Sequence, residues 1–210
     1  EDMIFESAMN GGRPERRMRR MPMPSLTGIH QHRNAALALA ALEAMSGFVV
    51  ADEAAALGLK STVWPARLQR LVRGPLVDLL PDGWQLWLDG GHNEAAAMTI
   101  KTQTRRWRDK PLHLVFGMLN SKNPQDYLKH LEAKIGLLRA IAIPGEKNSL
   151  NPEQLCAAAN SWRLDAAPAA DIGEAVSGIV ASSEKSGGPA ARILIAGSLY
   201  LAGTVLEKNG

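Results

Sequence analysis

Trp84-Gln85-Leu86-Trp87-Leu88-Asp89-Gly90-Gly91-His92-Asn93-Glu94 is the stretch that decides the fold. Its first five residues form a short apolar run typical of a buried strand, and the two glycines permit backbone angles that other residues avoid. Asn93 is a suitable N-cap and Glu94 suits the positive end of a helix dipole, so we expect a helix to begin there. Asp89 and His92 are therefore predicted at the carboxyl end of a strand. Ligands bind at that position in open α/β sheets, and backbone N–H groups there can hold an anion such as phosphate.

Strand-like and helix-like segments alternate after this stretch, which favours a mostly parallel sheet with helices on both faces. The expected strands are 85–89, 112–116, 140–143 and 192–196, with a further short strand near 162–164. The expected helices are 94–107, 124–135, 152–160, 172–182 and 200–208. Asn151 and Asp171 are suitable N-caps for two of them. The sequence therefore predicts an α/β fold for this part of the chain.

The N-terminal segment has a different pattern. Residues 3–6 predict a strand, and Asn10-Gly11-Gly12 predicts a turn. Five arginines between residues 13 and 20 are compatible with a nucleic-acid-binding arm, but no aromatic residues are interleaved with them. We therefore interpret this segment as a solvated hairpin and expect no nucleic-acid partner.

Two helices are predicted after the hairpin. Residues 28–45 are rich in Ala, Leu and Glu, which favour helix, and residues 52–57 form a second, shorter helix. Asp52 is a suitable N-cap for the second helix, and Gly58 is expected to end it. The N-terminal part thus predicts a hairpin followed by two helices.

The bulk properties exclude several classes of protein. The chain has 210 residues, a net charge of +3 and one cysteine. One cysteine excludes an intrachain disulfide framework and favours a reducing compartment, so we expect the cytoplasm and a buried packing role for Cys156 on a helix. No apolar run approaches the ~20 residues of a membrane span, and no signal peptide is apparent. Because the first residue is Glu1 rather than Met, we interpret the chain as a fragment.

Several chemical motifs are missing or incomplete. His30 and His32 are two residues apart, so they do not converge on one helical face, and no carboxylate or cysteine accompanies them. We therefore predict no metal site. Neither a Gly-x-Gly-x-x-Gly dinucleotide fingerprint nor a Gly-x-x-x-x-Gly-Lys-Ser/Thr phosphate loop occurs, and Gly197-Ser198-Leu199 is not the Gly-x-Ser-x-Gly elbow of a serine hydrolase.

Four short motifs follow one another along the chain. They are His30-Gln31-x-x-Asn34-Ala35, Trp64-Pro65-Ala66-Arg67-Leu68, Asp89-Gly90-Gly91-His92-Asn93 and Gly197-Ser198-Leu199-Tyr200-Leu201. In type and in order they resemble the motifs of the folylpolyglutamate synthase and dihydrofolate synthase family, which belongs to the Mur ligase superfamily. Met21-Pro22-Met23-Pro24 also resembles a Leu-Pro-Leu-Pro-like stretch of that family. The resemblance covers about residues 20–210.

The chain departs from the family pattern in two of these regions. Ala66 stands where the family has Gly, and Gln69 where it has Glu. The segment 116–123 resembles the family's Phe-Gly-x-x-x-Asp-Lys-Asp loop, but Ser121 and Asn123 replace the two aspartates while the intervening lysine is retained.

The resemblance implies a fold and a division into domains. Residues 63–210 would form the Rossmann-like C-terminal domain of a Mur ligase, with a mostly parallel sheet and helices on both faces. Residues 1–62 would be a remnant of the central ATP-binding domain. The family carries its phosphate loop, its magnesium ligands and a modified lysine in more N-terminal regions, and this sequence contains none of them.

The resemblance also implies roles for particular residues. Asn34 would contact the adenine of ATP, and Asp89 would accept hydrogen bonds from the ribose hydroxyls. Arg67, whose guanidinium fork matches phosphate oxygens, would bind the phosphates, and His92 would lie close to the nucleotide, so both are candidate catalytic residues. Ser198 would help to hold the incoming glutamate, although simple helix capping is an equally good interpretation. Without the resemblance, Asp89 is already a functional candidate, because burying a carboxylate without a partner is costly.

The implied reaction is ATP-dependent amide formation. A carboxylate of dihydropteroate or tetrahydrofolate would be phosphorylated by ATP with Mg²⁺, and the amine of L-glutamate would attack the acyl phosphate. We expect small-molecule substrates, no membrane, a monomer, and no ligase activity from this chain alone. Two alternatives remain: a Mur-type peptidoglycan ligase, and a stand-alone nucleotide-binding or interaction module without catalysis.

Overall fold

The computed structural model describes residues 2–10, 13–132 and 134–209. Contacts divide the chain into two compact units, Glu1–Pro65 and Ala66–Gly210, which are called the first and the second unit below. The division falls three residues after the boundary predicted at 62/63. That residues 1–62 belong to an ATP-binding domain stays a prediction.

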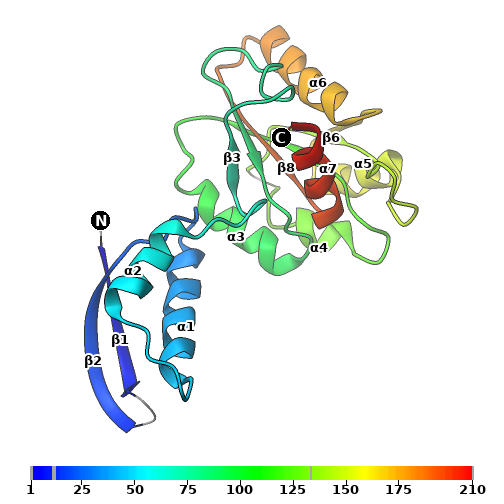
Figure 1. Cartoon of the computed structure of the whole chain (residues 1–210). Helices are drawn as coiled ribbons and strands as arrows, with labels where there is room; N and C mark the ends of the chain where they lie inside the picture. The colour runs from blue at the N-terminus through cyan, green and yellow to red at the C-terminus, as the bar shows by residue number, and fades with distance from the viewer. Residues whose placement is uncertain (1, 11–12, 133, 210) are drawn as a thin grey trace. The chain divides into compact units, whose positions relative to one another are not determined.

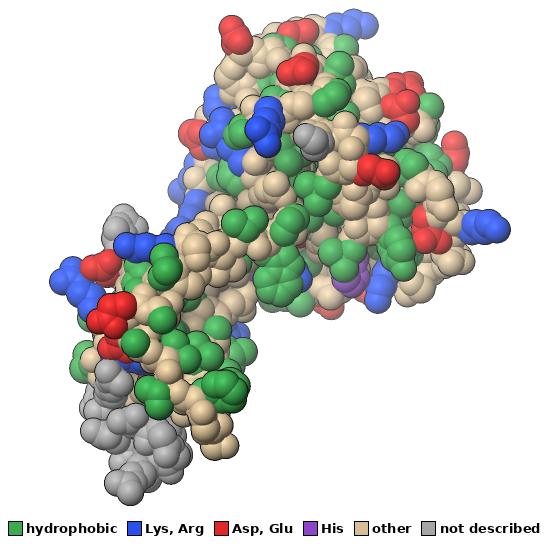
Figure 2. Space-filling model, viewed as in Figure 1, with side chains coloured by type: hydrophobic (Ala, Val, Ile, Leu, Met, Phe, Trp, Pro, Cys, Tyr) green, Lys and Arg blue, Asp and Glu red, His purple; other side chains and the backbone are tan. Residues whose placement is uncertain are grey.

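The first unit is a β-hairpin with two helices (Figure 1). β1 (Asp2–Asn10) pairs antiparallel with β2 (Arg13–Pro22), and α1 (His30–Ala44) and α2 (Asp52–Ser61) follow. The predicted hairpin and both helices are confirmed, while Gly11 and Gly12 of the expected turn lie outside the described residues. Several large hydrophobic side chains of this unit are exposed, among them Leu37, Met45, Phe48, Val49 and Leu57. Figure 2 shows hydrophobic side chains on the visible face of this unit.

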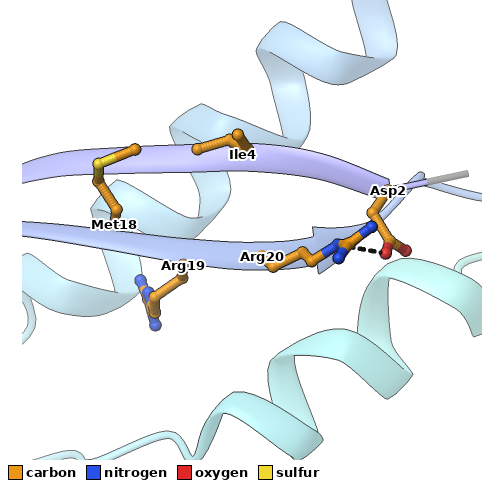
Figure 3. Close-up of a pocket in the computed structure, with 5 residues that line it drawn as sticks. All are labelled: Asp2, Ile4, Met18, Arg19 and Arg20. Carbon is orange, nitrogen blue, oxygen red and sulfur yellow. Dashed lines mark ion pairs between the residues drawn. The ribbon is translucent and has the colours of Figure 1, made fainter.

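The two faces of the hairpin differ. On one face, Phe5 and Met21 are buried in a small core with Leu39 of α1 and Ala55 of α2. The buried guanidinium of Arg19 joins this face to the helices through ion pairs with Glu43 and Asp52. Figure 3 shows Arg19 pointing away from Ile4 and Met18, and it shows the ion pair of 2.7 Å between Arg20 and Asp2.

The prediction for the ends of α2 was wrong. The N-cap is Ala51, and Asp52 is the first helical residue, where its carboxylate lies in the first turn and pairs with Arg19. The helix continues through Gly58 to Ser61. Gly58 does not end the helix. Its carbonyl accepts hydrogen bonds from both the N–H and the hydroxyl of Thr62, so the carbonyl has partners in the last helical turn.

The second unit contains a six-stranded sheet with the order β3-β4-β8-β5-β6-β7 (Figure 1). The strands are β3 (Gln69–Leu71), β4 (Gln85–Leu88), β5 (Leu112–Phe116), β6 (Leu137–Ala140), β7 (Asp165–Pro168) and β8 (Arg192–Ala196). β3 runs antiparallel to β4, and the other neighbouring strands are parallel. The predicted mostly parallel sheet is therefore confirmed.

Helices cover both faces of this sheet. They are α3 (Glu94–Thr104), α4 (Pro124–Leu128), α5 (Pro152–Asn160), α6 (Ile172–Lys185) and α7 (Leu199–Asn209). One hydrophobic core contains residues of α3, α4 and α5, and the other contains residues of α6 and α7. Alternate residues of β5 and β8 enter the two cores, as expected for strands buried on both sides.

The predicted N-caps Asn93, Asn151 and Asp171 each accept a hydrogen bond from the first helical turn. Cys156 is buried on α5, as predicted, and burial raises the pKa of its thiol.

Several elements of this unit differ from the sequence prediction. β6 ends at Ala140 instead of beginning there, because the apolar segment that follows it forms a buried loop rather than a strand. β7 begins at Asp165 rather than near residue 162, since Arg163 has a φ of 56° and forms a turn before it. α4 ends at Leu128, well before residue 135, and the three-residue β3 was not predicted. No helix among the described residues is long and apolar enough to span a membrane.

A buried histidine should make this unit sensitive to acid. His113 of β5 is 6% exposed, and its Nδ1 accepts a hydrogen bond of 3.0 Å from the Leu137 N–H, so the neutral ring is the form that fits. Burial, and secondarily the charge of Arg139, lower the pKa of His113 below its usual value. The unfolded chain therefore binds a proton that the folded unit does not, and stability is lost as the pH falls below about 6.5.

We expect the free energy of unfolding to decrease by at most about 1.4 kcal/mol per pH unit from this one group. Urea unfolding of the wild-type chain and of His113→Gln between pH 7.5 and pH 5 would measure the effect. The wild-type chain should lose more stability over this range than the variant does. Equal losses would show that His113 contributes nothing.

Candidate functional site

The second unit has a topological switch point at the carboxyl ends of β4 and β8. These strands are parallel neighbours, but α3 follows β4 on one face of the sheet, whereas α7 follows β8 on the other. The two following loops are joined, because the Gly197 N–H donates a hydrogen bond of 3.1 Å to the Gly91 carbonyl. Diverging helices leave a crevice at such a point, and ligands of open α/β sheets bind there.

Asp89 connects this crevice to the loop before β3. Its side chain is buried, with 8% of the residue exposed. Oδ2 accepts a hydrogen bond of 2.9 Å from the Leu68 N–H, and Oδ1 accepts one of 2.8 Å from the Gly91 N–H. The cost of burying the carboxylate, which made Asp89 a candidate, is therefore offset by backbone partners.

The loop that carries Arg67 has an unusual backbone. Ala66 and Leu68 on either side of it have φ angles of 57° and 44°, in the left-handed region that costs a residue with a side chain about 1–2 kcal/mol. The Ala66 carbonyl accepts a bond of 2.8 Å from the Gly90 N–H, and the Ala66 N–H donates one of 2.8 Å to Oε1 of Gln69. Alanine thus keeps the left-handed turn at the position where the family motif has glycine. The exposed side chain of Arg67 is presented by a loop fixed to the strand end that carries Asp89.

His92 lies on the other side of the same turn. Its half-buried ring is 3.1 Å from the Gly90 carbonyl through Nδ1. Because a carbonyl can only accept, Nδ1 carries a proton in this arrangement, which leaves a lone pair on Nε2 whenever the ring is neutral. His92 and Ser198 both line a cavity of about 190 Å³ at the ends of the strands.

Ser198 begins α7. It is 1% exposed, and its hydroxyl oxygen accepts a hydrogen bond of 3.1 Å from the Tyr200 N–H. The helix-capping interpretation of Ser198 is therefore supported by this contact. Capping uses a lone pair of the hydroxyl oxygen, and the O–H remains a donor. Contact with a substrate is compatible with capping.

Asn34 belongs to the first unit and is described there alone. It lies on α1, is exposed, and donates a hydrogen bond of 2.9 Å to the buried Gln31. Both side chains line a mostly apolar cavity of about 480 Å³ together with Trp64. The structure thus brings Arg67, Asp89, His92 and Ser198 to one edge of a sheet, and it places Asn34 in a separate cavity of the other unit.

Lys122 was not among the predicted site residues, yet it lines the same cavity as His92 and Ser198. It follows β5, which is the neighbour of β8, so its loop lies at the same edge of the sheet. The position of Lys122 after a strand could have indicated that it belongs to the candidate site, because the carboxyl ends of parallel strands meet at one edge of the sheet. Within residues 2–10, 13–132 and 134–209, no group of three or more His, Cys, Asp or Glu side chains could hold a metal ion.

Comparison with known proteins gives consistent relatives, although no family model matches the chain. Dihydrofolate synthase/folylpolyglutamate synthase of Bacillus subtilis is 35% identical over 112 residues, which are 51% of this chain and 24% of that protein. Folylpolyglutamate synthase of Lacticaseibacillus casei is 25% identical over 185 residues, 87% of this chain and 39% of that protein. The structure of Mycobacterium tuberculosis folylpolyglutamate synthase complexed with ADP and AMPPCP aligns with a TM-score of 0.74 at 22% identity, covering 96% of this chain and 46% of that chain.

The fold and the switch-point site define an open α/β-sheet domain that shares its fold with solved folylpolyglutamate synthases. Within that class, the chain is a relative of folylpolyglutamate synthase/dihydrofolate synthase and corresponds to its C-terminal portion. The chain spans less than half the length of the curated relatives reported above.

Proposed function

We propose that this chain supplies the C-terminal part of an ATP-dependent ligase that joins L-glutamate to dihydropteroate or tetrahydrofolate. The observation that carries the proposal is the crevice between the ends of β4 and β8, where Asp89, His92 and Ser198 come together beside the Arg67 loop. The names of the relatives, which are all folate ligases, support the folate substrate over the peptidoglycan alternative.

The same crevice suits a nucleotide. Solved relatives contain ADP, AMPPCP, or AMPPNP with a manganese ion. In this chain, the Arg67 guanidinium would bind phosphate oxygens, and Asp89 would accept hydrogen bonds from the ribose hydroxyls. That Asn34, a residue of the first unit, contacts the adenine stays a prediction from the resemblance. Magnesium would neutralise phosphate charge, and we expect its ligands outside this chain.

The residues of the crevice would act mainly by position and charge. An oxygen of the folate carboxylate attacks the γ-phosphorus of ATP, ADP leaves, and the amine nitrogen of glutamate then attacks the acyl carbon while phosphate leaves. Activation is needed because a free carboxylate resists attack by an amine. Arg67 would stabilise the transferring phosphoryl group, and Nε2 of a neutral His92 would take a proton from the amine. Ser198 would hold the glutamate.

The remaining parts of the proposal concern the partners, the oligomeric state and the location of the protein. We propose small-molecule substrates only, a monomer, a cytoplasmic location, and binding without turnover by this chain alone. A stand-alone binding module would share the nucleotide contacts and differ in having no catalytic partner domain.

Titration calorimetry with ADP tests the nucleotide site. We expect the 210-residue chain to bind ADP and Arg67→Ala to bind it about tenfold more weakly, which corresponds to about 1.4 kcal/mol. Arg105→Ala is the matched control. Arg105 is exposed at the end of α3, where the chain returns to the amino ends of the parallel strands, away from the crevice. Equal ADP affinities for the two variants would count against the proposed role of Arg67.

A further inference from the structure

A groove of about 350 Å³ runs beside β3, the strand at one edge of the sheet. In the described part of the chain β3 pairs only with β4, so its other edge presents unpaired backbone N–H and C=O groups. The groove shares no lining residue with the cavity that contains His92 and Ser198. Its lining comes from β3, from the segment after β3 and from the last turn of α7: Gln69, Arg70, Leu71, Val72, Arg73, Leu206 and Asn209.

The groove is positively charged. Arg70 and Arg73 line it and are both exposed, and none of its lining residues is acidic. Over residues 2–10, 13–132 and 134–209, no ion pair joins either arginine to a carboxylate. Figure 2 shows several Lys and Arg side chains on the side of the second unit where β3 lies. The charge of the groove therefore favours an anionic ligand.

The backbone that carries Arg73 is held by the end of α7. Nδ2 of Asn209 donates a hydrogen bond of 2.8 Å to the Arg73 carbonyl, and Oδ1 of Asn209 accepts one of 2.9 Å from the Leu76 N–H. Gly74 has a φ of 102°, and an added Cβ there would overlap the backbone carbonyl oxygen of Asn209. Because this backbone is already fixed, binding a ligand would order only the arginine side chain.

The groove begins next to the crevice. Gln69 at its start pairs with Leu88, the residue before Asp89. Because β3 runs antiparallel to β4, the chain then leads away from the crevice toward the amino ends of the parallel strands. Residues of an extended chain are about 3.3 Å apart, so Arg70 and Arg73 lie at most about 10 Å from each other along the backbone. The positive charges thus follow the groove away from the crevice.

A chain of linked glutamates matches these features. Glutamate has one amine and two carboxylates, so each residue of such a chain keeps one free carboxylate, whichever carboxylate forms the amide. Its methylene groups would contact the exposed Val72 and the half-buried Leu206, and its amide groups would bond to the open edge of β3. A polyphosphate has the negative charges but no methylene groups, so it matches the arginines and not the apolar walls.

We propose that the groove between β3 and the end of α7 binds the glutamate chain of a folate that already carries several glutamates. The inference rests on the proposed function, because repeated addition of glutamate supplies such a chain. Arg70 and Arg73 would each bind one free carboxylate, since the guanidinium fork matches the two carboxylate oxygens. Holding the chain in this groove keeps its terminal glutamate beside the crevice, where the next glutamate would be added.

NMR titration of the ¹⁵N-labelled 210-residue chain with pteroyltetraglutamate and with pteroylmonoglutamate tests the groove. We expect the tetraglutamate to bind about tenfold more tightly, with amide shifts in residues 69–73 and 206–209. Arg70→Gln and Arg73→Gln should each lower the affinity for the tetraglutamate about threefold, and the double variant about tenfold. The affinity for the monoglutamate should stay unchanged, so the preference disappears in the double variant.

Two controls define the site and the ligand. Arg163 is exposed before β7, the strand at the other edge of the sheet, so Arg163→Gln should keep the wild-type preference. Tripolyphosphate supplies negative charge without methylene groups and should bind more weakly than the tetraglutamate. If tripolyphosphate shifted the same amides at equal or lower concentration, the groove would be a general anion site and the assignment to a glutamate chain would be wrong.

ADP titration of the same samples separates this inference from the proposed function. ADP binding without a preference for the tetraglutamate, or a preference that persists in the double variant, would overturn the role of the groove while the nucleotide site stands. A preference that depends on the two arginines in a chain that binds no ADP would support the groove and overturn the proposed nucleotide function. Absence of binding by ADP and by both folates would overturn both.

Discussion

Replacing Asp89 with alanine is expected to lower the free energy of unfolding of the second unit by about 3–5 kcal/mol. The carboxylate accepts hydrogen bonds from the buried N–H groups of Leu68 and Gly91, and alanine would leave both without an acceptor. Each bond to a charged acceptor contributes about 1.5–3 kcal/mol, and a buried donor left unsatisfied costs a similar amount. Urea unfolding followed by tryptophan fluorescence would measure the change.

Two further variants test whether the loss of stability comes from the hydrogen bonds of the Asp89 carboxylate. Asp89→Asn keeps the shape of the side chain and one acceptor oxygen, but its NH₂ group would face one of the two N–H donors, so an intermediate loss is expected. Asp82→Ala removes an exposed carboxylate and should change stability by less than about 0.5 kcal/mol. A loss below about 1 kcal/mol for Asp89→Ala would contradict the structural role. ADP affinity should also fall in this variant, because the Arg67 loop loses one of its anchors.

Replacing Gly197 with alanine is expected to cost about 3 kcal/mol and to displace Ser198. Gly197 has a φ of 112°, and an added Cβ would lie 2.4 Å from the Gly117 carbonyl oxygen and 2.7 Å from the Phe116 ring. The left-handed region costs a residue with a side chain about 1–2 kcal/mol, and forcing an atom into a packed core costs about 1–3 kcal/mol. Because one contact is with backbone, the strand end itself must move. Thermal or urea unfolding would measure the loss.

Substitutions at two other glycines separate the cost of the left-handed backbone from the cost of the steric clash. Gly187 has a φ of 68° with no described heavy atom within 4 Å of an added Cβ, so Gly187→Ala should show the backbone cost alone, about 1–2 kcal/mol. Gly203 lies inside α7, also without a described neighbour within 4 Å, and Gly203→Ala should increase stability by about 0.5–1 kcal/mol. If Gly197→Ala cost no more than Gly187→Ala, the steric explanation would be wrong.

The sequence predicted those parts of the fold in which local signals agree. α5 was predicted with its observed bounds because Asn151 and Pro152 mark its start. β5 and β8 were also predicted with their observed bounds, since both are continuous apolar runs. α4 was predicted too long, because apolar residues such as Leu131 and Ile135 continue its pattern while the chain has already turned to enter β6. β3 has only three residues and exists through its pairing with β4, which no local pattern encodes.

The candidate site could be predicted only in part for the same reason. Asp89, His92 and Ser198 follow apolar strands, so their common edge is a consequence of parallel pairing. The partners of Asp89 are 21 residues away at Leu68 and two residues away at Gly91, and residue types do not reveal the first of these. The left-handed angles of Ala66 and Leu68 are likewise imposed by tertiary hydrogen bonds, since neither residue favours them.

The position of β8 has a consequence for how the second unit is assembled. β8 is the last strand along the chain, yet it lies between β4 and β5, and Arg192 at its start bonds to Gln85, 107 residues earlier. Until β8 is inserted, β4 and β5 each present an unpaired edge, and neither core is closed. Contacts so distant in sequence slow folding, and exposed edges favour association with other chains. During synthesis the crevice that holds Asp89 and His92 can therefore form only after Gly197 has left the ribosome.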